Sequence, residues 1–378
     1  MTRVHVVGIV GARPNFMKMA PVARLLGRHP KFRFILVHTG QHYAGLSDPF
    51  FRELGLPDPD YHLRVGSAGA AEQIGRVVTR LVPVLRETRP ALVLVVGDVT
   101  STLAGAIAAH KMGFRVGHIE AGLRSFDSSM PEEINRRLTD AISDYCFTHS
   151  PEADRNLRRE GVPAGRIFRV GNLMIDTLLR FRRAAARSPI LERLGIRNRA
   201  YALATLHRPS NVDEEKKLSE LVAVFRRIAE RLPVVFPVHP RTWKSGLRLG
   251  LWRASDRAFD VKGPGSVKEG LLLTEPLGYL DFIHLQSSAR FVLTASGGVQ
   301  EETTVLGVPC LTLRENTERP ITVTRGTNRL VGTDPKRILG QVERLLNGSG
   351  PSPRVPPLWD GRAAERLVRV LEREFLSR

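Results

Sequence analysis

A carboxylate and an arginine follow the end of an apolar run near residue 120. Glu120 comes directly after the run that ends at Ile119, and Arg124 follows across the small pair Ala121-Gly122. A glutamate held in apolar surroundings has a raised pKa and can act as an acid or a base near neutral pH. The alternative is a buried ion pair between Glu120 and Arg124. The spacing therefore marks Glu120 as a candidate for proton transfer.

Two further carboxylates stand at the start of a predicted helix. Glu132 and Glu133 follow Ser129-Met130-Pro131. Ser129 with Glu132 fits a capping box, and acids in a first turn suit the helix dipole. Two acids for one helix start leave one of them free to face a cleft.

Asp98 lies at the mouth of another predicted strand, after the run Leu92–Val96 and Gly97. A carboxylate there can orient another group or take a proton. The alternative is an N-cap for the helix that begins near Ser101 or Thr102. The sequence leaves both roles open.

Basic groups follow two other predicted strands. Arg13 and Lys18 come after the first strand, and Pro14 between them suits the first turn of a helix,. His207 and Arg208 follow a strand in the second half of the chain. Cations at strand ends suit a phosphate, although isolated ones are often surface or structural side chains. No Gly-x-Gly-x-x-Gly motif is present here, which argues against a dinucleotide site of the usual kind.

The segment Ser296-Gly297-Gly298 connects a predicted strand to a predicted helix. Bare glycines and a hydroxyl at a helix N-terminus form a cradle for a diphosphate. Glu302, one turn further on, could bind ribose hydroxyls. A tight turn alone would also account for the two glycines.

Apolar runs alternate with helical patterns, which indicates parallel sheets covered on both faces. The predicted strands are 4–10, 32–39, 91–96, 115–119, 201–206, 234–238, 271–274, 291–294 and 310–313, and the clearest helices are 16–27, 71–88, 101–112, 214–231 and 361–376. The pattern restarts after residue 172. We therefore predict an α/β protein with two doubly wound domains, 1–172 and 173–360, whose ligands bind beyond the carboxyl ends of the strands.

The composition argues against several classes of partner. No apolar run reaches the roughly 18 residues needed to span a bilayer, so we expect no membrane segment. The net charge is +19, but only nine of the 57 cations are lysines and no nucleic-acid-binding motif occurs,. We expect no specific nucleic-acid partner and instead a cleft for an anionic ligand. Cys146 and Cys310 lie in apolar contexts, and free, buried thiols suit the cytoplasm,.

Nine segments, taken together and in order, resemble the non-hydrolysing UDP-N-acetylglucosamine 2-epimerases. They are Gly-Ala-Arg-Pro-Asn-Phe-Met-Lys (11–18), Thr-Gly-Gln-His (39–42), Gly-Asp-Val-Thr-Ser (97–101), His-Ile-Glu-Ala-Gly-Leu-Arg (118–124), Pro-Glu-Glu-Ile-Asn-Arg (131–136), Gly-Asn (171–172), His-Arg-Pro (207–209), Ser-Gly-Gly-Val-Gln-Glu-Glu (296–302) and Thr-Glu-Arg-Pro (317–320). The resemblance implies a GT-B fold, in which two Rossmann-like domains hold the active site in the cleft between them. It also implies a homodimer, and a terminal helix, 361–378, that crosses back to the first domain.

The resemblance also assigns roles to residues. The catalytic residues it implies are Asp98, Glu120, Glu132 and His207. The substrate-binding residues it implies are Arg13, Lys18, Arg136, Phe282, Ser296, Gly297, Gly298, Glu302 and Arg319. Phe282 would lie near the uracil, the serine and glycines would meet the phosphates, and Glu302 would meet the ribose.

The chemistry of the expected substrate narrows the route. The C2 proton of an N-acetylhexosamine is not acidic, so inversion needs oxidation at C3 or departure of UDP to give a 2-acetamidoglucal. With no nicotinamide motif, elimination and re-addition of UDP is the consistent route, and we expect neither a cofactor nor a metal. His207, Arg13 and the Ser296 helix terminus would hold UDP, while the three acids move the C2 proton. Which acid serves which face stays open.

Departures from the family pattern concern the turn and the regulation. Ala295 replaces an aspartate before Ser-Gly-Gly, which could loosen the turn. Bacterial members are often activated by a second substrate molecule, and the matching regulatory positions are Gln41, His42 and His239. Because Ala44 replaces a glutamine and Pro209 an arginine, we predict that activation is weak, absent or dependent on other contacts.

Three alternatives remain beside the leading one. An epimerase of a diacetamido or uronic acid UDP-sugar tends to lose the Thr-Glu-Arg-Pro segment that this chain keeps. A GT-B glycosyltransferase would share the diphosphate cradle without needing Glu120 and Glu132. A basic nucleic-acid-binding protein on the same fold would lose affinity steeply with salt.

Overall fold

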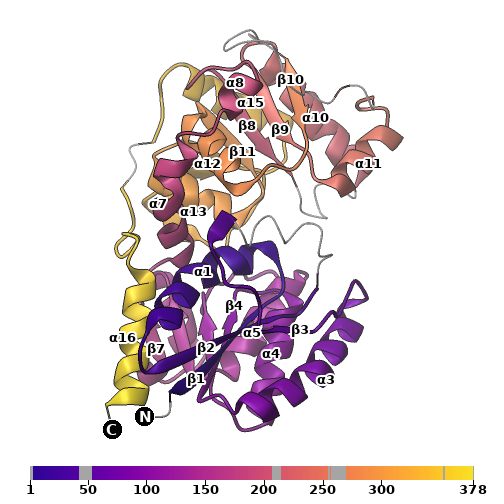
Figure 1. Ribbon diagram of the computed structural model, residues 1–378. Coiled ribbons are helices and arrows are strands. Elements are labelled where there is room, and N and C mark those ends of the chain that lie inside the picture. The colour runs from indigo at the N-terminus through magenta and orange to yellow at the C-terminus, as the bar shows by residue number, and fades with distance from the viewer. Residues whose placement is uncertain are drawn as a thin grey trace. The chain divides into compact units, whose positions relative to one another are not determined.

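The chain divides into two units, and the division falls inside a helix (Figure 1). The computed structural model describes residues 3–41, 53–206, 214–253, 256, 270–351 and 354–377. The first unit comprises Met1–Arg180 and Pro357–Arg378, and the second comprises Phe181–Pro356. Helix α7 (Leu173–Ala185) carries the division, whereas the sequence suggested a boundary after residue 172.

The first unit contains a parallel sheet with the strand order β3-β2-β1-β4-β5-β6-β7. Its strands are β1 (Val4–Val10), β2 (Phe32–His38), β3 (Tyr61–His62), β4 (Leu92–Val96), β5 (Val116–Ile119), β6 (Tyr145–Thr148) and β7 (Ile167–Arg169). The order reverses between β1 and β4, and such a switch point is where doubly wound sheets bind ligands. The residues that follow β1, β4 and β5 therefore define the edge of interest.

Helices cover both faces of this sheet. They are α1 (Arg13–Arg28), α3 (Ala70–Thr88), α4 (Thr100–Lys111), α5 (Pro131–Ala141), α6 (Pro151–Arg159) and α16 (Ala363–Leu376), with a short 3₁₀ turn η2 (Ala164–Arg166). Gly8 of β1 faces Met19 of α1, whereas its neighbour Ile9 faces Gly105 of α4. Successive strand residues point to opposite faces, so α1 and α4 lie on opposite sides of the sheet. Apolar residues of α3 and α4 complete the core on the α4 side.

The second unit repeats the architecture with the strand order β10-β9-β8-β11-β12-β13, again with parallel pairs. Its strands are β8 (Ala202–Thr205), β9 (Val234–Pro237), β10 (Leu271–Thr274), β11 (Phe291–Thr294), β12 (Cys310–Thr312) and β13 (Asn328–Leu330). Its helices are α8 (Ile190–Arg193), α10 (Glu215–Ala229), α11 (Pro240–Arg248), α12 (Tyr279–Ser288), α13 (Gly297–Leu306), α14 (Pro320–Thr324) and α15 (Pro335–Leu346). The switch point lies between β8 and β11.

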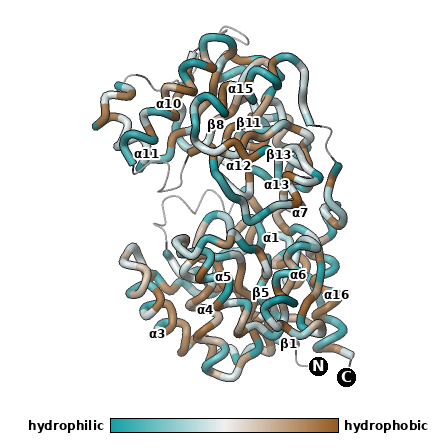
Figure 2. The backbone as a smooth tube through the Cα atoms, turned by 180° about the vertical axis from the view of Figure 1, so that it is seen from behind, coloured by the Kyte–Doolittle hydropathy of each residue, from teal (hydrophilic) through white to brown (hydrophobic). Residues whose placement is uncertain are grey.

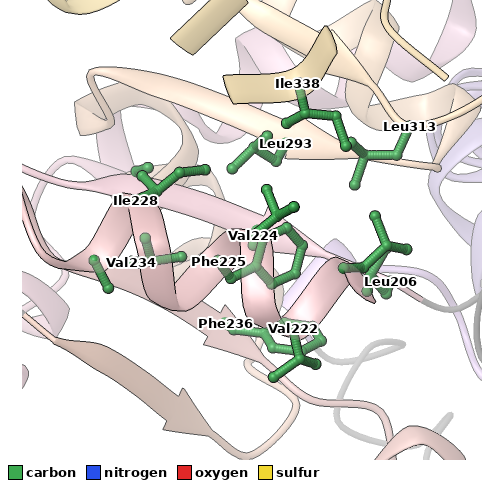
Figure 3. Close-up of a cluster of buried hydrophobic side chains, with 14 of the residues drawn as sticks. Leu206, Val222, Val224, Phe225, Ile228, Val234, Phe236, Leu293, Leu313 and Ile338 are labelled. Atoms are coloured by element: carbon green, nitrogen blue, oxygen red, sulfur yellow. The ribbon is translucent and has the colours of Figure 1, made fainter. Parts of the chain in front are cut away.

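Aromatic and branched side chains fill the core of the second unit (Figure 3). Phe225 of α10 meets Phe236 of β9 edge to face, with ring centroids 5.5 Å apart. Leu293 and Ile338 belong to the same buried cluster, which joins β11 to α15. Hydrophobic and hydrophilic stretches alternate along α10 and α3, as expected for helices with one buried face (Figure 2),.

The C-terminal segment is part of the first unit. Helix α16, yellow in Figure 1, packs beside the indigo helix α1. Ahead of it, the Trp359 indole is buried and donates from Nε1 to the His149 carbonyl over 3.0 Å. The Asp176 carboxylate of α7 accepts hydrogen bonds from the first amides of α16, Ala363 N at 3.0 Å and Ala364 N at 2.7 Å. Burial raises the pKa of Asp176 to about 6.

The cysteine prediction is confirmed, since Cys146 and Cys310 are both free and buried. Burial raises the pKa of the Cys310 thiol to about 12, so this thiol is inert at neutral pH,. Among the described residues, no helix combines the length and apolar character needed to cross a bilayer.

Candidate active site

Lys18 and Glu120 form a buried ion pair at the switch point of the first sheet. Lys18 lies in α1, directly after β1, and Glu120 follows the last residue of β5. The alternative partner suggested by the sequence is wrong, because Arg124 pairs instead with Asp140 and Glu160. Glu120 is thus a carboxylate held against a cation, rather than one surrounded only by apolar groups.

The backbone at Glu120 is unusual. Its φ is +72°, in the left-handed region that non-glycine residues rarely adopt,. The amides of Glu120 and Ala121 both donate to the carbonyl of Phe147 on the neighbouring strand, at 3.0 and 3.1 Å. Such conformations cost free energy and concentrate at functional sites, where the surrounding fold enforces them. The backbone conformation therefore fixes the direction in which the Glu120 side chain points from the end of β5.

Asn15 and Gly97 bring the ends of β1 and β4 to this ion pair. The Asn15 side chain accepts from the amides of Gly11 and Ala12, both at 3.1 Å, and donates to the carbonyl of Val96 at 2.9 Å. Gly97 has a φ of +69°, and a Cβ there would lie 3.4 Å from Glu120 Oε2. A Cβ would therefore only touch the carboxylate, and it is the left-handed backbone that favours glycine at position 97,.

Asp98 and Glu133 are bridged by the buried guanidinium of Arg136. Arg136 donates to Asp98 Oδ2 from Nε at 3.0 Å and from Nη2 at 2.8 Å, and to Glu133 Oε2 from Nη1 at 2.6 Å. The N-cap of α4 is Val99, so the proposed capping role of Asp98 is wrong. Arg136, which we expected to contact substrate, holds the Asp98 carboxylate in place.

The predicted capping box is also wrong. The N-cap of α5 is Met130, and the Ser129 hydroxyl donates to Asp127 Oδ1 at 2.6 Å. Glu133 instead accepts from the amide of Ser125 at 2.8 Å and so orders the loop before the helix. Glu132 is half-buried and makes no hydrogen bond or ion pair with the described part of the chain. Glu133, rather than Glu132, is therefore the acid that supports this helix start.

A buried His118–Asp140 pair, which the sequence did not reveal, supports the turn that carries Asp98. His118 Nδ1 lies 2.6 Å from Asp140 Oδ1, and Nε2 lies 2.7 Å from the carbonyl of Gly97. The ring thus links the Asp140 carboxylate to the backbone of Gly97. Despite the opposing effect of burial, the charges of His118 and Arg124 hold the pKa of Asp140 below its usual value,.

A small pocket opens beside the ion pair within the first unit. Lys18 and Glu120 line it together with His149 and Asn172. Asn172 belongs to a segment that matched the family pattern, but no role was assigned to it from the sequence. Arg13 is the first residue of α1, the helix that also carries Lys18, and its side chain is half-buried.

In the second unit, Ser296, Gly297 and Gly298 form the N-terminus of α13 at the switch point. Ser296 is the N-cap residue, yet its hydroxyl does not cap the helix. A Cβ at Gly297 would lie 2.2 Å from an Nη of Arg319, so this glycine admits the guanidinium to the helix terminus. Arg319 is held there by Glu301, whose Oε1 accepts from Nε at 2.8 Å. Amides, a hydroxyl and a cation thus surround a site suited to phosphate.

Glu302 belongs to α13 itself, and Phe282 belongs to α12, which packs against α13. Glu302 is buried, and its Oε1 accepts from the Tyr279 hydroxyl at 3.1 Å. With its amide in the orientation that satisfies both ends, Gln286 donates to the other carboxylate oxygen at 3.0 Å. Phe282 is half-buried on α12, the helix that carries Tyr279.

The model of the family described as UDP-N-acetylglucosamine 2-epimerase matches residues 24–372. The chain belongs to this family.

Individual relatives agree with the family match. The UDP-N-acetylglucosamine 2-epimerase of Methanococcus maripaludis is 40% identical over 376 residues, which cover 97% of this chain and 98% of the relative. The UDP-2,3-diacetamido-2,3-dideoxy-D-glucuronate 2-epimerase of Pseudomonas aeruginosa is 41% identical over 348 residues, covering 91% and 92%. Relatives of similar identity to this chain therefore carry names with different substrates.

Solved structures confirm the expected GT-B architecture of two Rossmann-like domains. The structure of the Methanocaldococcus jannaschii UDP-GlcNAc 2-epimerase in complex with UDP-GlcNAc and UDP has a TM-score of 0.87 and 39% identity, covering 98% of this chain and all of that one. A sucrose-phosphate synthase from Thermosynechococcus elongatus, with 14% identity and a TM-score of 0.59, shares the fold alone.

The family's regulatory positions are only partly described. His42 and the catalytic candidate His207 lie outside the described residues. Gln41 is buried, and its Oε1 accepts from the Ser101 amide at 3.1 Å and hydroxyl at 2.6 Å. His239 is the N-cap of α11 and accepts from the Arg241 amide at 3.3 Å. Gln41 and His239 therefore each support a helix start.

Proposed function

We propose that this chain interconverts UDP-N-acetylglucosamine and UDP-N-acetylmannosamine by inverting C2 of the sugar. The observation that carries the proposal is the buried Lys18–Glu120 pair at the switch point of the first sheet. It places a carboxylate of fixed orientation where proton chemistry is expected, in a chain that belongs to the 2-epimerase family. The product would supply cell-surface polysaccharide synthesis.

The first step is an elimination. A carboxylate takes the C2 proton, the C1–O bond breaks, and its electrons leave with the β-phosphate oxygen of UDP, which gives 2-acetamidoglucal. Glu120 is our candidate for one face of C2, and Asp98 or Glu132 for the other. A positioned acid or base contributes about 10²–10⁴-fold to such a step. Re-addition of UDP with protonation from the opposite face completes the inversion.

The leaving UDP needs positive charge and directed amides. We assign this task to the N-terminus of α13, with Ser296, Gly297 and Gly298, and to Arg319, together with Arg13 and His207. Preorganised donors at a leaving group stabilise charge as it develops, and losing one such donor costs about 10²–10³-fold in kcat in other enzymes. Glu302 and Phe282 are the candidates for ribose and uracil.

A second candidate substrate is a diacetamido uronic acid UDP-sugar. We retain this candidate because the Pseudomonas relative, which is named for such a substrate, is 41% identical to this chain. Against it stands the Thr-Glu-Arg-Pro segment (317–320), which epimerases of such sugars tend to lose and which this chain keeps. We therefore rank UDP-N-acetylglucosamine first.

The deciding experiment is NMR of UDP-N-acetylglucosamine incubated with the protein in D₂O. We expect deuterium at C2 and the appearance of UDP-N-acetylmannosamine, with no free sugar accumulating. Free N-acetylmannosamine would indicate a hydrolysing enzyme. No exchange here, but exchange with the diacetamido uronate substrate, would favour the second candidate.

Assembly and regulation are part of the same proposal. We propose a cytoplasmic homodimer in which activation by a second substrate molecule is weak or absent. A mass of one chain in light scattering would contradict the dimer. A rate clearly sigmoidal in UDP-N-acetylglucosamine, or an absolute need for it in the reverse direction, would contradict the regulatory part.

A further inference from the structure

The pocket beside the Lys18–Glu120 pair has apolar walls and a few polar groups. Ile119, Phe147, Val170 and Leu173 supply the walls. The enclosed space between these side chains has room for one group the size of a water molecule or a methyl,. A pocket of this kind recognises a small group that is apolar at its end and polar at its attachment.

Asn172, which lines this pocket, carries a hydrogen-bond donor that no described residue uses. Its Oδ1 accepts from the amide of Met174 at 2.9 Å, in the first turn of α7, and this bond fixes the orientation of the side-chain amide. Its Nδ2 is buried and has no acceptor among the described residues. Asn172 is 4% exposed. A buried donor without a partner is costly, and it is explained by a group that arrives with the ligand.

We propose that this pocket receives the 2-acetamido group of the sugar, with Asn172 Nδ2 donating to its carbonyl oxygen. The proposal rests on the proposed function, because Glu120 is there assigned to the proton on C2. The acetamido group is attached to that same carbon, so a pocket lined by Glu120 lies within reach of it. The methyl group then packs on the apolar walls.

The arrangement makes the pocket a determinant of specificity. A 2-hydroxyl sugar such as that of UDP-glucose would leave the Asn172 amide unpaired and the apolar walls empty. Sites built to hydrogen-bond a substrate group reject analogues that lack it much more strongly than apolar pockets reject a shorter chain. The Asn172 donor therefore selects an N-acylated sugar.

The first test replaces the donor while keeping the helix cap. Asn172→Asp and Asn172→Ser both retain an oxygen that can accept from Met174 N, whereas Asn172→Ala removes the cap as well. We expect KM for UDP-N-acetylglucosamine to rise about 5- to 20-fold in the Asp and Ser variants, with Kd for UDP alone unchanged. A purely structural role would weaken both ligands in step with thermal stability and most of all in the Ala variant, and that result would overturn the proposal.

The second test changes the size of the acyl group. We expect the wild-type protein to turn over UDP-N-butanoylglucosamine at least 50-fold less efficiently than the acetyl substrate. Val170→Ala shortens one wall side chain and so enlarges the pocket. We expect this variant to use the butanoyl substrate at least tenfold more efficiently than the wild type does. Equal use of both acyl groups by the wild type, or no gain in the variant, would place the acyl group elsewhere.

These outcomes are distinct from failure of the proposed function. If the wild-type protein exchanges no C2 proton of UDP-N-acetylglucosamine, the function itself is wrong. If it does exchange that proton and Asn172→Asp leaves KM unchanged, only the acyl pocket is wrong.

Discussion

The Lys18 ammonium and the Glu120 carboxylate form a buried ion pair between helix α1 and the end of strand β5. The two residues are 102 positions apart in the sequence, and each follows a strand that borders β4. Removing one partner of a buried pair leaves an uncompensated charge, whereas removing both need not be costly. The pair therefore couples the stability of the site to the group we assign to catalysis.

Glu120→Gln should abolish detectable C2 exchange, with kcat falling by at least about 10²-fold because the base is lost. We expect Glu120→Gln and Lys18→Met each to lower the free energy of unfolding by about 3–5 kcal/mol. The double variant should recover much of this stability without recovering activity. Urea unfolding and deuterium NMR would measure the two quantities, and a simple sum of the two stability losses would contradict the coupling.

Arg136→Lys should lower kcat about 10- to 100-fold with a smaller effect on KM, because one ammonium cannot replace the three hydrogen bonds that Arg136 makes to Asp98 and Glu133. Its neighbour Arg137 has an exposed side chain, 4.0 Å from Glu160, and provides the matched control. Arg137→Lys should leave steady-state kinetics unchanged. Equal effects of the two substitutions would show that the orientation of Asp98 does not matter.

Gly297→Ala should weaken UDP binding by about tenfold or more, because a Cβ would displace Arg319 from the N-terminus of α13,. The helix itself should tolerate the change, since alanine favours helices over glycine by about 0.5–1 kcal/mol. Gly340 in α15 has nothing within 4 Å of its ideal Cβ, so Gly340→Ala tests the helix effect alone. Calorimetric titration with UDP would separate the variants, and undiminished affinity in Gly297→Ala would remove α13 from the diphosphate site.

The docking of α16 should depend on pH through Asp176. Burial raises the pKa of this carboxyl from 3.8 unfolded to about 6 in the folded protein, so the folded state binds the proton more tightly. The stability it contributes is present below pH 4 and is lost as the pH rises through 6, by about 2–3 kcal/mol in all. Thermal unfolding of wild type and Asp176→Asn between pH 4 and 8 should show this fall in their difference. A difference that stays constant over the range would contradict it.

Several elements could be predicted from the sequence because their apolar patterns are local. The predicted strands 271–274 and 291–294 coincide with β10 and β11, and the predicted helix 71–88 differs from α3 by one residue. Strands β3, β7 and β13 have only two or three residues, too few for a period to appear,. Strand β6 (Tyr145–Thr148) was also missed, although Ser143-Asp144 before it and Ser150-Pro151 after it are turn signals,.

The sequence allowed us to predict where the acids of the candidate site lie, but not which residues they contact. The ends of β4 and β5 placed Asp98 and Glu120 at one edge of a sheet. Their partners, Arg136 and Lys18, come from helices far along the chain, and nothing local to the sequence selects them. The capping prediction for Ser129 failed for a related reason, because Asp127, only two residues away, competes for its hydroxyl,.

Helix α16 has a consequence for how the protein is made. The first unit needs Pro357–Arg378, yet the whole second unit, Phe181–Pro356, is translated in between. At about 5–20 residues per second, the face of α1 remains uncovered for roughly 15 to 70 seconds before α16 has been synthesised,. Trp359 and α16 are therefore the last parts of the first unit to be synthesised and packed. A chain that ended before them would leave apolar residues of the N-terminal core exposed.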